Sequence, residues 1–74
     1  MGERSIVELY LCIFFENGRV LGVRGIDEPG DGAARTGAAK LAVQHPNCTH
    51  IEVWTRGTRV GKMQGRERRT PAPN

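Results

Sequence analysis

The chain has 74 residues, a formal net charge of +3 and two cysteines. A domain of this length buries only about 60% of its unfolded surface, so it is marginally stable unless a partner supports it. Two cysteines without a secretory signal exclude a disulfide-rich scaffold and indicate a reducing cytoplasm. The apolar run 5–15 contains Glu8 and is too short to span a bilayer, so we expect no membrane association.

The charge is unevenly distributed along the chain. Residues 1–55 carry a net charge of −2, and residues 56–74 carry +5. The segment after Gly65 is rich in arginine and proline and has almost no apolar residues, which is typical of disorder. We therefore predict a single small α+β domain over 1–65 and a disordered basic tail over 66–74. A basic end suits an acidic partner such as RNA or DNA, although such tails are often only solvated.

Residues 6–15 and 19–26 predict a β-hairpin, because β-branched and aromatic residues alternate on either side of a Gly-containing turn. The odd-numbered residues from Val7 to Phe15 are assigned to the buried face of the sheet. The even-numbered residues, such as Tyr10 and Phe14, then lie on the opposite face.

The register of this hairpin depends on its turn. A two-residue Asn-Gly loop would place Leu11 opposite Arg24, among apolar side chains. A three-residue loop, with Gly18 as a left-handed bulge residue, pairs Leu11 with Val23 instead. We predict this second register, since a one-residue slip would turn the whole second strand to the other face.

A helix is predicted from Gly32 to about His45, where good helix formers predominate, with Asp31 as its N-cap and Pro46 as its stop. One stripe of the helix combines small residues that allow close approach to a sheet: Ala34, Ala38, Leu41, Ala42 and His45. Gly37 is unfavourable inside a helix, so we expect another segment to approach its backbone closely. Arg35, Thr36 and Lys40 should face solvent.

A second hairpin is predicted, from His50–Thr55 and a short strand at 59–63 around an Arg56-Gly57 turn. A two-residue loop there pairs Thr55 with Thr58, Trp54 with Arg59 and Val53 with Val60. The order of elements is ββαββ. A right-handed crossover that skips the first strand gives an antiparallel sheet in the order 2-1-3-4, with one helix packed on one face.

The two faces of this predicted sheet have different compositions. The helix-covered side is predicted to hold Val7, Leu9, Leu11, Ile13, Phe15, Leu21, Val23, Ile51, Val53 and Val60. The helix-free side is predicted to hold Tyr10, Cys12, Phe14, Val20, Arg24, Trp54 and Arg59, with Glu8 and Glu52 among them. The second set is too apolar for an ordinary solvent-exposed surface.

Trp, Tyr and Arg are enriched at the energetic centres of protein interfaces. The sequence therefore predicts a non-enzymatic interaction module that uses its helix-free sheet face for homodimerisation or for binding another protein. The predicted interface residues are Tyr10, Phe14, Val20, Arg24, Trp54 and Arg59.

The alternative is a single-stranded RNA or DNA binder, in which aromatic rings stack on bases and cations hold phosphates. Glu8 and Glu52 on the same face argue against this alternative. Its predicted contact residues are Tyr10, Arg24, Trp54, Arg56, Arg59, Lys62, Arg66, Arg68 and Arg69.

His45, Cys48 and His50 have side chains that zinc prefers, and Cys12 could supply a fourth ligand. Their spacing matches no common zinc motif, so we predict no metal site and interpret these residues as structural. No cofactor is expected either, because Gly30–Arg35 has an arginine where a dinucleotide-binding turn needs its third glycine. No nucleophile and base stand beside a third, orienting residue, so no catalytic residue is predicted.

Overall fold

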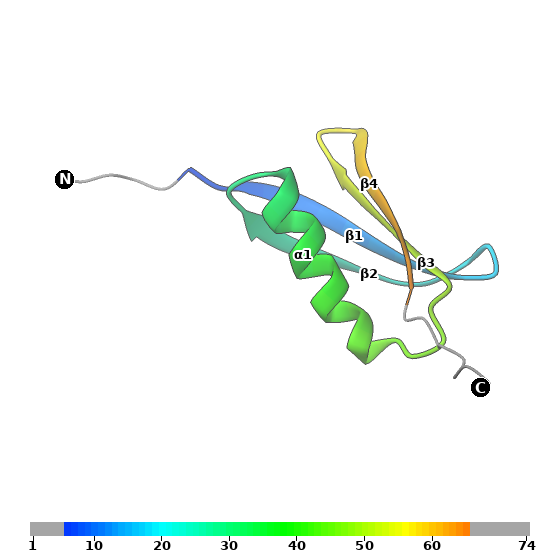
Figure 1. The fold of residues 1–74 in the computed structure, drawn as a ribbon. Helices are drawn as coiled ribbons and strands as arrows, with labels where there is room; N and C mark the ends of the chain where they lie inside the picture. The colour runs from blue at the N-terminus through cyan, green and yellow to red at the C-terminus, as the bar shows by residue number, and fades with distance from the viewer. Residues whose placement is uncertain (1–5, 66–74) are drawn as a thin grey trace.

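The computed structural model describes residues 6–65 and contains the elements in the order ββαββ (Figure 1). They are β1 (Glu8–Glu16), β2 (Arg19–Glu28), α1 (Asp31–Leu41), the 3-10 turn η1 (Ala42–Gln44), β3 (His50–Thr55) and β4 (Thr58–Gln64). The strands pair antiparallel in the order β2-β1-β3-β4, and α1 lies on one face of the sheet. The predicted α+β class and strand order are confirmed. The predicted tail 66–74 lies outside the described residues.

No helix among residues 6–65 is both long and apolar enough to cross a membrane.

The first hairpin uses a two-residue turn, so the predicted three-residue loop is wrong. Asn17 and Gly18 have φ values of 50° and 89°, as a type I′ turn requires at both central positions. Phe15 therefore pairs with Val20. A bulge at position 21 then shifts the register by one residue, so that Leu11 lies opposite Gly25. Because of the bulge, Leu11 does not lie opposite Arg24. That pairing was the reason for preferring the longer loop.

The second hairpin has the predicted two-residue turn, with Arg56 and Gly57 at φ 52° and 77°. The pairs Thr55 with Thr58 and Trp54 with Arg59 are confirmed. A bulge at position 60 follows, so Val53 pairs with Gly61 and not with Val60.

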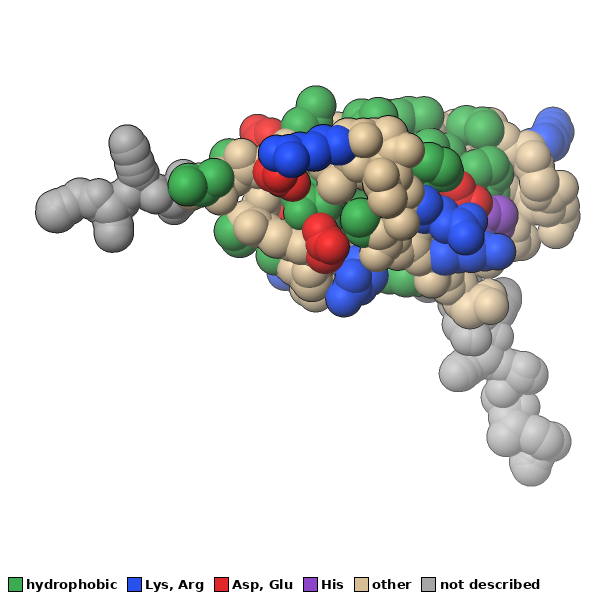
Figure 2. Space-filling model, turned by 90° about the horizontal axis from the view of Figure 1, so that it is seen from above, with side chains coloured by type: hydrophobic (Ala, Val, Ile, Leu, Met, Phe, Trp, Pro, Cys, Tyr) green, Lys and Arg blue, Asp and Glu red, His purple; other side chains and the backbone are tan. Residues whose placement is uncertain are grey.

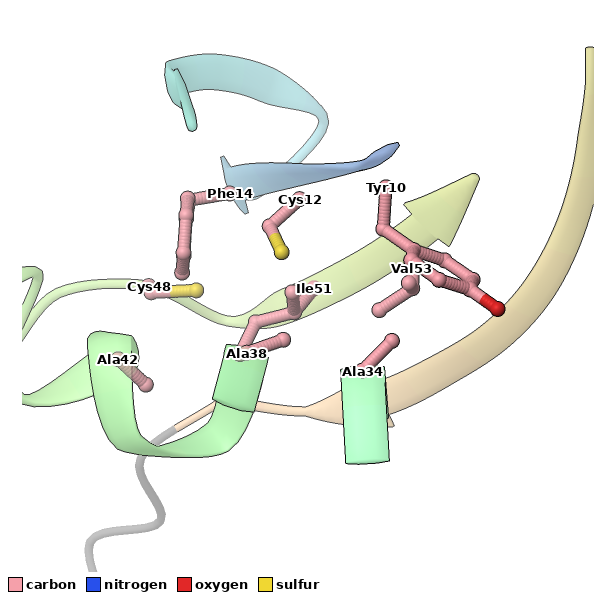
Figure 3. Packing of buried hydrophobic residues seen from close by; sticks show 9 residues of the cluster. All are labelled: Tyr10, Cys12, Phe14, Ala34, Ala38, Ala42, Cys48, Ile51 and Val53. Carbon is pink, nitrogen blue, oxygen red and sulfur yellow. The ribbon is translucent and has the colours of Figure 1, made fainter. Parts of the chain in front are cut away.

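The helix covers the even-numbered side of β1, which is the reverse of the predicted face. Tyr10, Cys12 and Phe14 are at most 1% exposed and point toward α1 (Figure 3), whereas Leu9 and Leu11 are 59% and 42% exposed. Placing the odd-numbered residues of β1, together with Leu21 and Val23 of β2, under the helix was therefore wrong. The assignment of Ile51, Val53 and Val60 to the helix side is confirmed.

The pairing of β1 with β3 explains this reversal. Phe14 lies opposite Ile51 and Cys12 lies opposite Val53, and residues opposite one another in a sheet share a face. Because β1 is apolar on both sides, its alternation alone could not select the side that α1 covers. The contact between two strands far apart in sequence makes that selection.

The predicted helix stripe is confirmed: Ala34, Ala38 and Ala42 are buried (Figure 3), and Leu41 packs at the edge of the core. These small side chains leave room for the aromatic rings of β1. His45, just after η1, stacks on Phe14 with 4.5 Å between ring centroids.

Gly37 is approached closely by β2, as predicted. A Cβ atom there would lie 3.0 Å from Glu28 Oε2 and 3.2 Å from Ile26 Cδ1. The N-cap of α1 is Gly30, without a side-chain capping bond, so assigning that role to Asp31 was wrong. Asp31 Oδ1 instead accepts a 2.8 Å hydrogen bond from the Tyr10 hydroxyl. This bond ties the start of the helix to the central strand.

Burial and the bond to Asp31 raise the pKa of Tyr10 to about 12 from its ordinary value of 10.0. The neutral phenol is the form that folding favours. Its contribution to stability is therefore complete below pH 10 and is lost as the pH rises from 10 to 12. Because Tyr10 is the single tyrosine of the chain, phenolate absorbance reports its titration alone.

We expect Tyr10→Phe to lower the free energy of unfolding by about 1 kcal/mol at neutral pH, since one hydrogen bond is lost. We also expect the variant to lose part of the alkaline destabilisation between pH 10 and 12, measured by urea unfolding at several pH values. A wild-type phenol that titrates near 10 in the folded protein would contradict both the burial of Tyr10 and its bond to Asp31.

Candidate protein-interaction face

The side of the sheet opposite α1 is not covered by any described element, and we call it the helix-free face. Side chains alternate along each strand, and cross-strand partners share a side, so the registers identify its members. It consists of Leu9, Leu11, Ile13, Phe15, Val20, Val23, Asp27, His50, Glu52, Trp54, Arg59, Lys62 and Gln64.

The half of the helix-free face formed by β1 and β2 is exposed and, apart from Asp27 opposite Leu9, apolar. Leu9, Val20 and Val23 are 59%, 58% and 53% exposed. Hydrophobic side chains gather along one long side of the molecule (Figure 2). A sheet with one solvated face normally alternates apolar and polar side chains, so this half departs from the usual pattern.

A shallow groove of about 240 Å³ lies at one end of this apolar half. Leu9, Leu11, Ile13 and Trp54 line it, together with the turn between β3 and β4. The groove is almost entirely apolar in lining, and it is the hollow of the helix-free face into which an apolar side chain would fit.

The half formed by β3 and β4 is polar, and Glu52 lies at the centre of its side-chain contacts. Glu52 accepts a 2.9 Å hydrogen bond from Trp54 Nε1, and its other oxygen lies 3.3 Å from His50 Nε2 and 3.6 Å from Arg59 Nη1. The His50 ring in turn stacks on Phe15, with 4.4 Å between centroids and 4° between planes. These contacts join the polar half to the apolar half in a continuous surface.

The pKa of Glu52 is lowered, first by the hydrogen bond from Trp54 and further by His50 and Arg59, although burial acts in the opposite direction. A lowered folded-state pKa means that the contribution to stability is complete above the ordinary value of 4.5 and is lost as the pH falls through the folded-state pKa. The carboxylate is thus ionised at neutral pH.

We expect Glu52→Gln to lower the free energy of unfolding by about 1 kcal/mol at pH 7, because an amide cannot pair with Arg59 as a charge. The difference between the variant and the wild type should shrink as the pH falls below 4.5 and through the folded-state pKa of Glu52, as measured by urea unfolding across the acid range. Trp54→Phe removes the first cause of the pKa shift, so its acid destabilisation should begin at higher pH. A constant difference between Glu52→Gln and wild type at all pH values would contradict this account.

The structure separates the six predicted interface residues. Val20, Trp54 and Arg59 lie on the helix-free face, as predicted. Tyr10 and Phe14 do not, because they are buried under the helix. Arg24 pairs with Cys12 and so lies on the helix side at the edge of the sheet, where its Nη1 donates to Gln44 Oε1 at 3.2 Å.

The predicted nucleic-acid residues are separated in the same way. With Tyr10 in the core, Trp54 and Phe15 are the aromatic rings left on the helix-free face, and Phe15 is already stacked on His50. Arg56 pairs with Glu8 Oε2 at 2.6 Å, and Lys62 lies opposite Glu52. Arg66, Arg68 and Arg69 are outside the described residues. The helix-free face of the described sheet therefore offers no row of free aromatic rings on which successive bases could stack.

The weak metal-ligand candidates each have another contact. His45 stacks on Phe14, His50 lies beside Glu52, and the thiol of Cys48 donates to the His50 carbonyl at 3.1 Å. Burial raises the pKa of Cys48 and of Cys12, so both are thiols and not thiolates at neutral pH. Within residues 6–65, no three His, Cys, Asp or Glu side chains are grouped so as to hold a metal ion.

Leu9, Leu11, Ile13 and Val23 belong to the helix-free face but were absent from the predicted interface. The sequence does contain a signal that could have identified them. A helix with an alanine stripe leaves space for large rings, so Tyr10 and Phe14 fit beneath it better than the aliphatic residues do.

Comparison of the chain with protein-family models, curated proteins and solved structures finds no match.

Proposed function

We propose that the protein is a non-enzymatic interaction module that self-associates through its helix-free face. The observation that carries this proposal is the exposure of the apolar half of that face. Leu9, Val20 and Val23 are each more than half exposed, and Leu11 is 42% exposed, on two adjacent strands. Contiguous exposed apolar surface is typical of binding sites, because covering it is favourable by about 25 cal/mol per Å².

The size of the molecule supports a second copy as the partner. A stable interface takes roughly 800 Å² from each partner, which is about one sixth of the 4889 Å² surface of this chain. The helix-free face is one of the two outer sides of a two-layer molecule, the side that α1 leaves uncovered (Figure 1). A closed dimer covers both apolar halves at once, and a domain of this length gains stability by association.

The thiols support a non-enzymatic role. Cys12 and Cys48 are 0% and 4% exposed, and burial disfavours the thiolate of each. A nucleophilic cysteine needs an accessible thiolate. Both cysteines therefore serve as small apolar core residues.

The test is sedimentation of the chain from low to high micromolar concentration, with two matched variants. Val23 and Val43 are both exposed, at 53% and 71%, but Val43 lies in η1 on the other side of the molecule. Each dimer buries two copies of Val23, so Val23→Ser should raise the dissociation constant by roughly tenfold or more. Val43→Ser should leave it unchanged.

Two results would contradict the proposal. One is a chain that stays monomeric at high concentration while Trp54 fluoresces as a water-exposed indole. The other is a dimer that Val23→Ser and Val43→Ser affect equally, because its interface would then lie elsewhere.

A further inference from the structure

We infer that the outer edge of β2 pairs with the same edge of a second copy, antiparallel about a two-fold axis at Ile26. The two four-stranded sheets then join into one continuous sheet. This interface goes beyond the proposed function, because it uses an edge of the sheet and not the helix-free face. β2 is one of the two outer strands, and its residues 22–28 form a regular stretch between the bulge and Pro29.

The backbone groups of Gly25 and Asp27 point out of the sheet at this edge. The carbonyl of Leu9 accepts a 2.9 Å hydrogen bond from Thr55 on β3, so the odd-numbered backbone groups of β1 face β3. The even-numbered groups of β1 therefore face β2 and bond to their partners there, which are Gly22, Arg24, Ile26 and Glu28. Gly25 and Asp27 alternate with these partners, and both are exposed. Outward N–H and C=O groups on an edge strand are a template for another strand.

The opposite edge of the sheet, at β4, is protected against such pairing. It carries the cations Arg59 and Lys62, and the carbonyl of its bulge residue Val60 accepts a 3.2 Å hydrogen bond from Arg35 Nη1. Cationic side chains, prolines and bulges are the usual means by which proteins block a sheet edge. Residues 22–28 of β2 contain no lysine, no proline and no bulge. β2 is therefore the edge at which a second sheet fits.

The charges of β2 select the register. A two-fold axis at Ile26 places Arg24 opposite the partner's Glu28, and this ion pair forms twice. The same axis pairs Gly25 with the partner's Asp27, so that their outward backbone groups exchange hydrogen bonds. An axis at Arg24 would put two arginines opposite each other, and an axis at Gly25 would form no such ion pair. Opposite charges on neighbouring strands stabilise the pairing, and like charges destabilise it.

The surroundings of β2 leave room for this pairing. The buried stripe of α1 packs on β1 and β3 (Figure 3), and the helix meets β2 at Gly37, which has no side chain to extend over the edge. Arg24 is exposed, and its bond to Gln44 uses Nη1, so its other N–H groups can pair with a carboxylate. Ile26 lies at the axis, so the two isoleucines cover each other. On the other side of the sheet, each Asp27 lies opposite a glycine and stays open to solvent, where repulsion between the two carboxylates is screened.

The direct test is amide hydrogen exchange of the full chain, measured by NMR at low and high micromolar concentration. In a single copy the N–H groups of Gly25 and Asp27 lack a neighbouring strand, so they exchange quickly. In the pair each donates to the partner, so we expect exchange to slow by roughly tenfold or more as the concentration rises. The N–H groups of Lys62 and Gln64 point outward from β4 in the same way and should not change.

Charge reversal tests the register. In a pair of Arg24→Glu chains the residues opposite each other are both acidic, and in a pair of Glu28→Arg chains both are basic. We expect each variant alone to lose the slow exchange, because like charges then face each other. Mixing the two variants restores opposite charges at both sites. An isotope-labelled Arg24→Glu chain should therefore regain slow exchange when unlabelled Glu28→Arg chain is added, which also shows that both variants fold.

The outcomes distinguish this inference from the proposed function. Self-association without slow exchange at Gly25 and Asp27 overturns the β2 pair and leaves the helix-free face as the interface. Slow exchange at these residues, together with equal effects of Val23→Ser and Val43→Ser, overturns the proposed function alone. Slow exchange that charge reversal leaves intact overturns the axis at Ile26. A chain that stays monomeric at high concentration overturns both interfaces.

Discussion

Replacing Phe14 by alanine should lower the free energy of unfolding by roughly 3–5 kcal/mol, which is enough to unfold a domain of this size. Phe14 is 0% exposed, packs against the alanine stripe of α1 and stacks on His45. Phe15, its neighbour, lies on the helix-free face with one side against His50. Phe15→Ala should therefore cost only about 1 to 2 kcal/mol.

Urea unfolding, monitored by far-ultraviolet circular dichroism, measures the free energy of unfolding of the two variants. Low protein concentration keeps association from contributing to the apparent stability. Since the two substitutions remove the same atoms from adjacent positions, their difference reports which side of β1 the helix covers. A greater cost for Phe15→Ala would show that the odd-numbered side is the core.

Enlarging the alanine stripe should have the second largest effect. Ala38 is 0% exposed and faces the core at the middle of α1, so Ala38→Leu forces the helix away from the sheet. We expect a loss of about 1–3 kcal/mol, because overpacking strains a well-filled core. Ala39→Leu, at the next and exposed position, adds the same atoms to the same helix.

Thermal unfolding of the two alanine variants provides the measurement. Ala39→Leu should change the midpoint little, since leucine and alanine are both good helix formers. Equal losses in the two variants would mean that the helix does not approach the sheet as closely as the alanine stripe indicates.

The element types, their order and the position of the helix stripe were predictable from the sequence, because each depends on local periodicity. The stripe from Ala34 to Ala42 repeats with the period of a helix, and the strand from His50 alternates with the period of a sheet. The type I′ turn of Arg56-Gly57 was also predictable. Its two-residue length fixed the pairs nearest the turn.

The bulges were not predictable, and they moved the registers. Each inserts one residue just beyond a tight turn, at position 21 in β2 and at position 60 in β4. These bulges leave little trace in the sequence, because the glycine that follows each bulge residue, Gly22 or Gly61, fits either side of the sheet. The sequence around Leu21 therefore fits two registers, and the argument from side-chain chemistry alone selected the wrong one.

The sequence predicted the kind of candidate site, an apolar sheet face, but some of its residues were assigned to the wrong face. The expectation of an apolar, helix-free face was sound because the chain has one helix and two hydrophobic sides of a sheet. Trp54 was assigned to this face, since β3 has polar and apolar sides that alternation can distinguish. Tyr10 was misassigned because β1 has no polar side, and its hydroxyl found a partner in Asp31, which starts the helix 21 residues later.

The position of β1 in the chain also governs how the protein reaches its native state. β1 is the first of the described elements and occupies the interior of the sheet, yet its second neighbour, β3, follows only after β2 and α1. Leu11 pairs with Trp54, 43 residues further on, whereas its pairing with β2 closes across a two-residue turn. Closing the longer loop costs more chain entropy, so the β1–β2 hairpin should form early and the docking of β3 should limit the folding rate. Until that step, a strand that is apolar on both sides stays uncovered, so aggregation competes with folding at this stage.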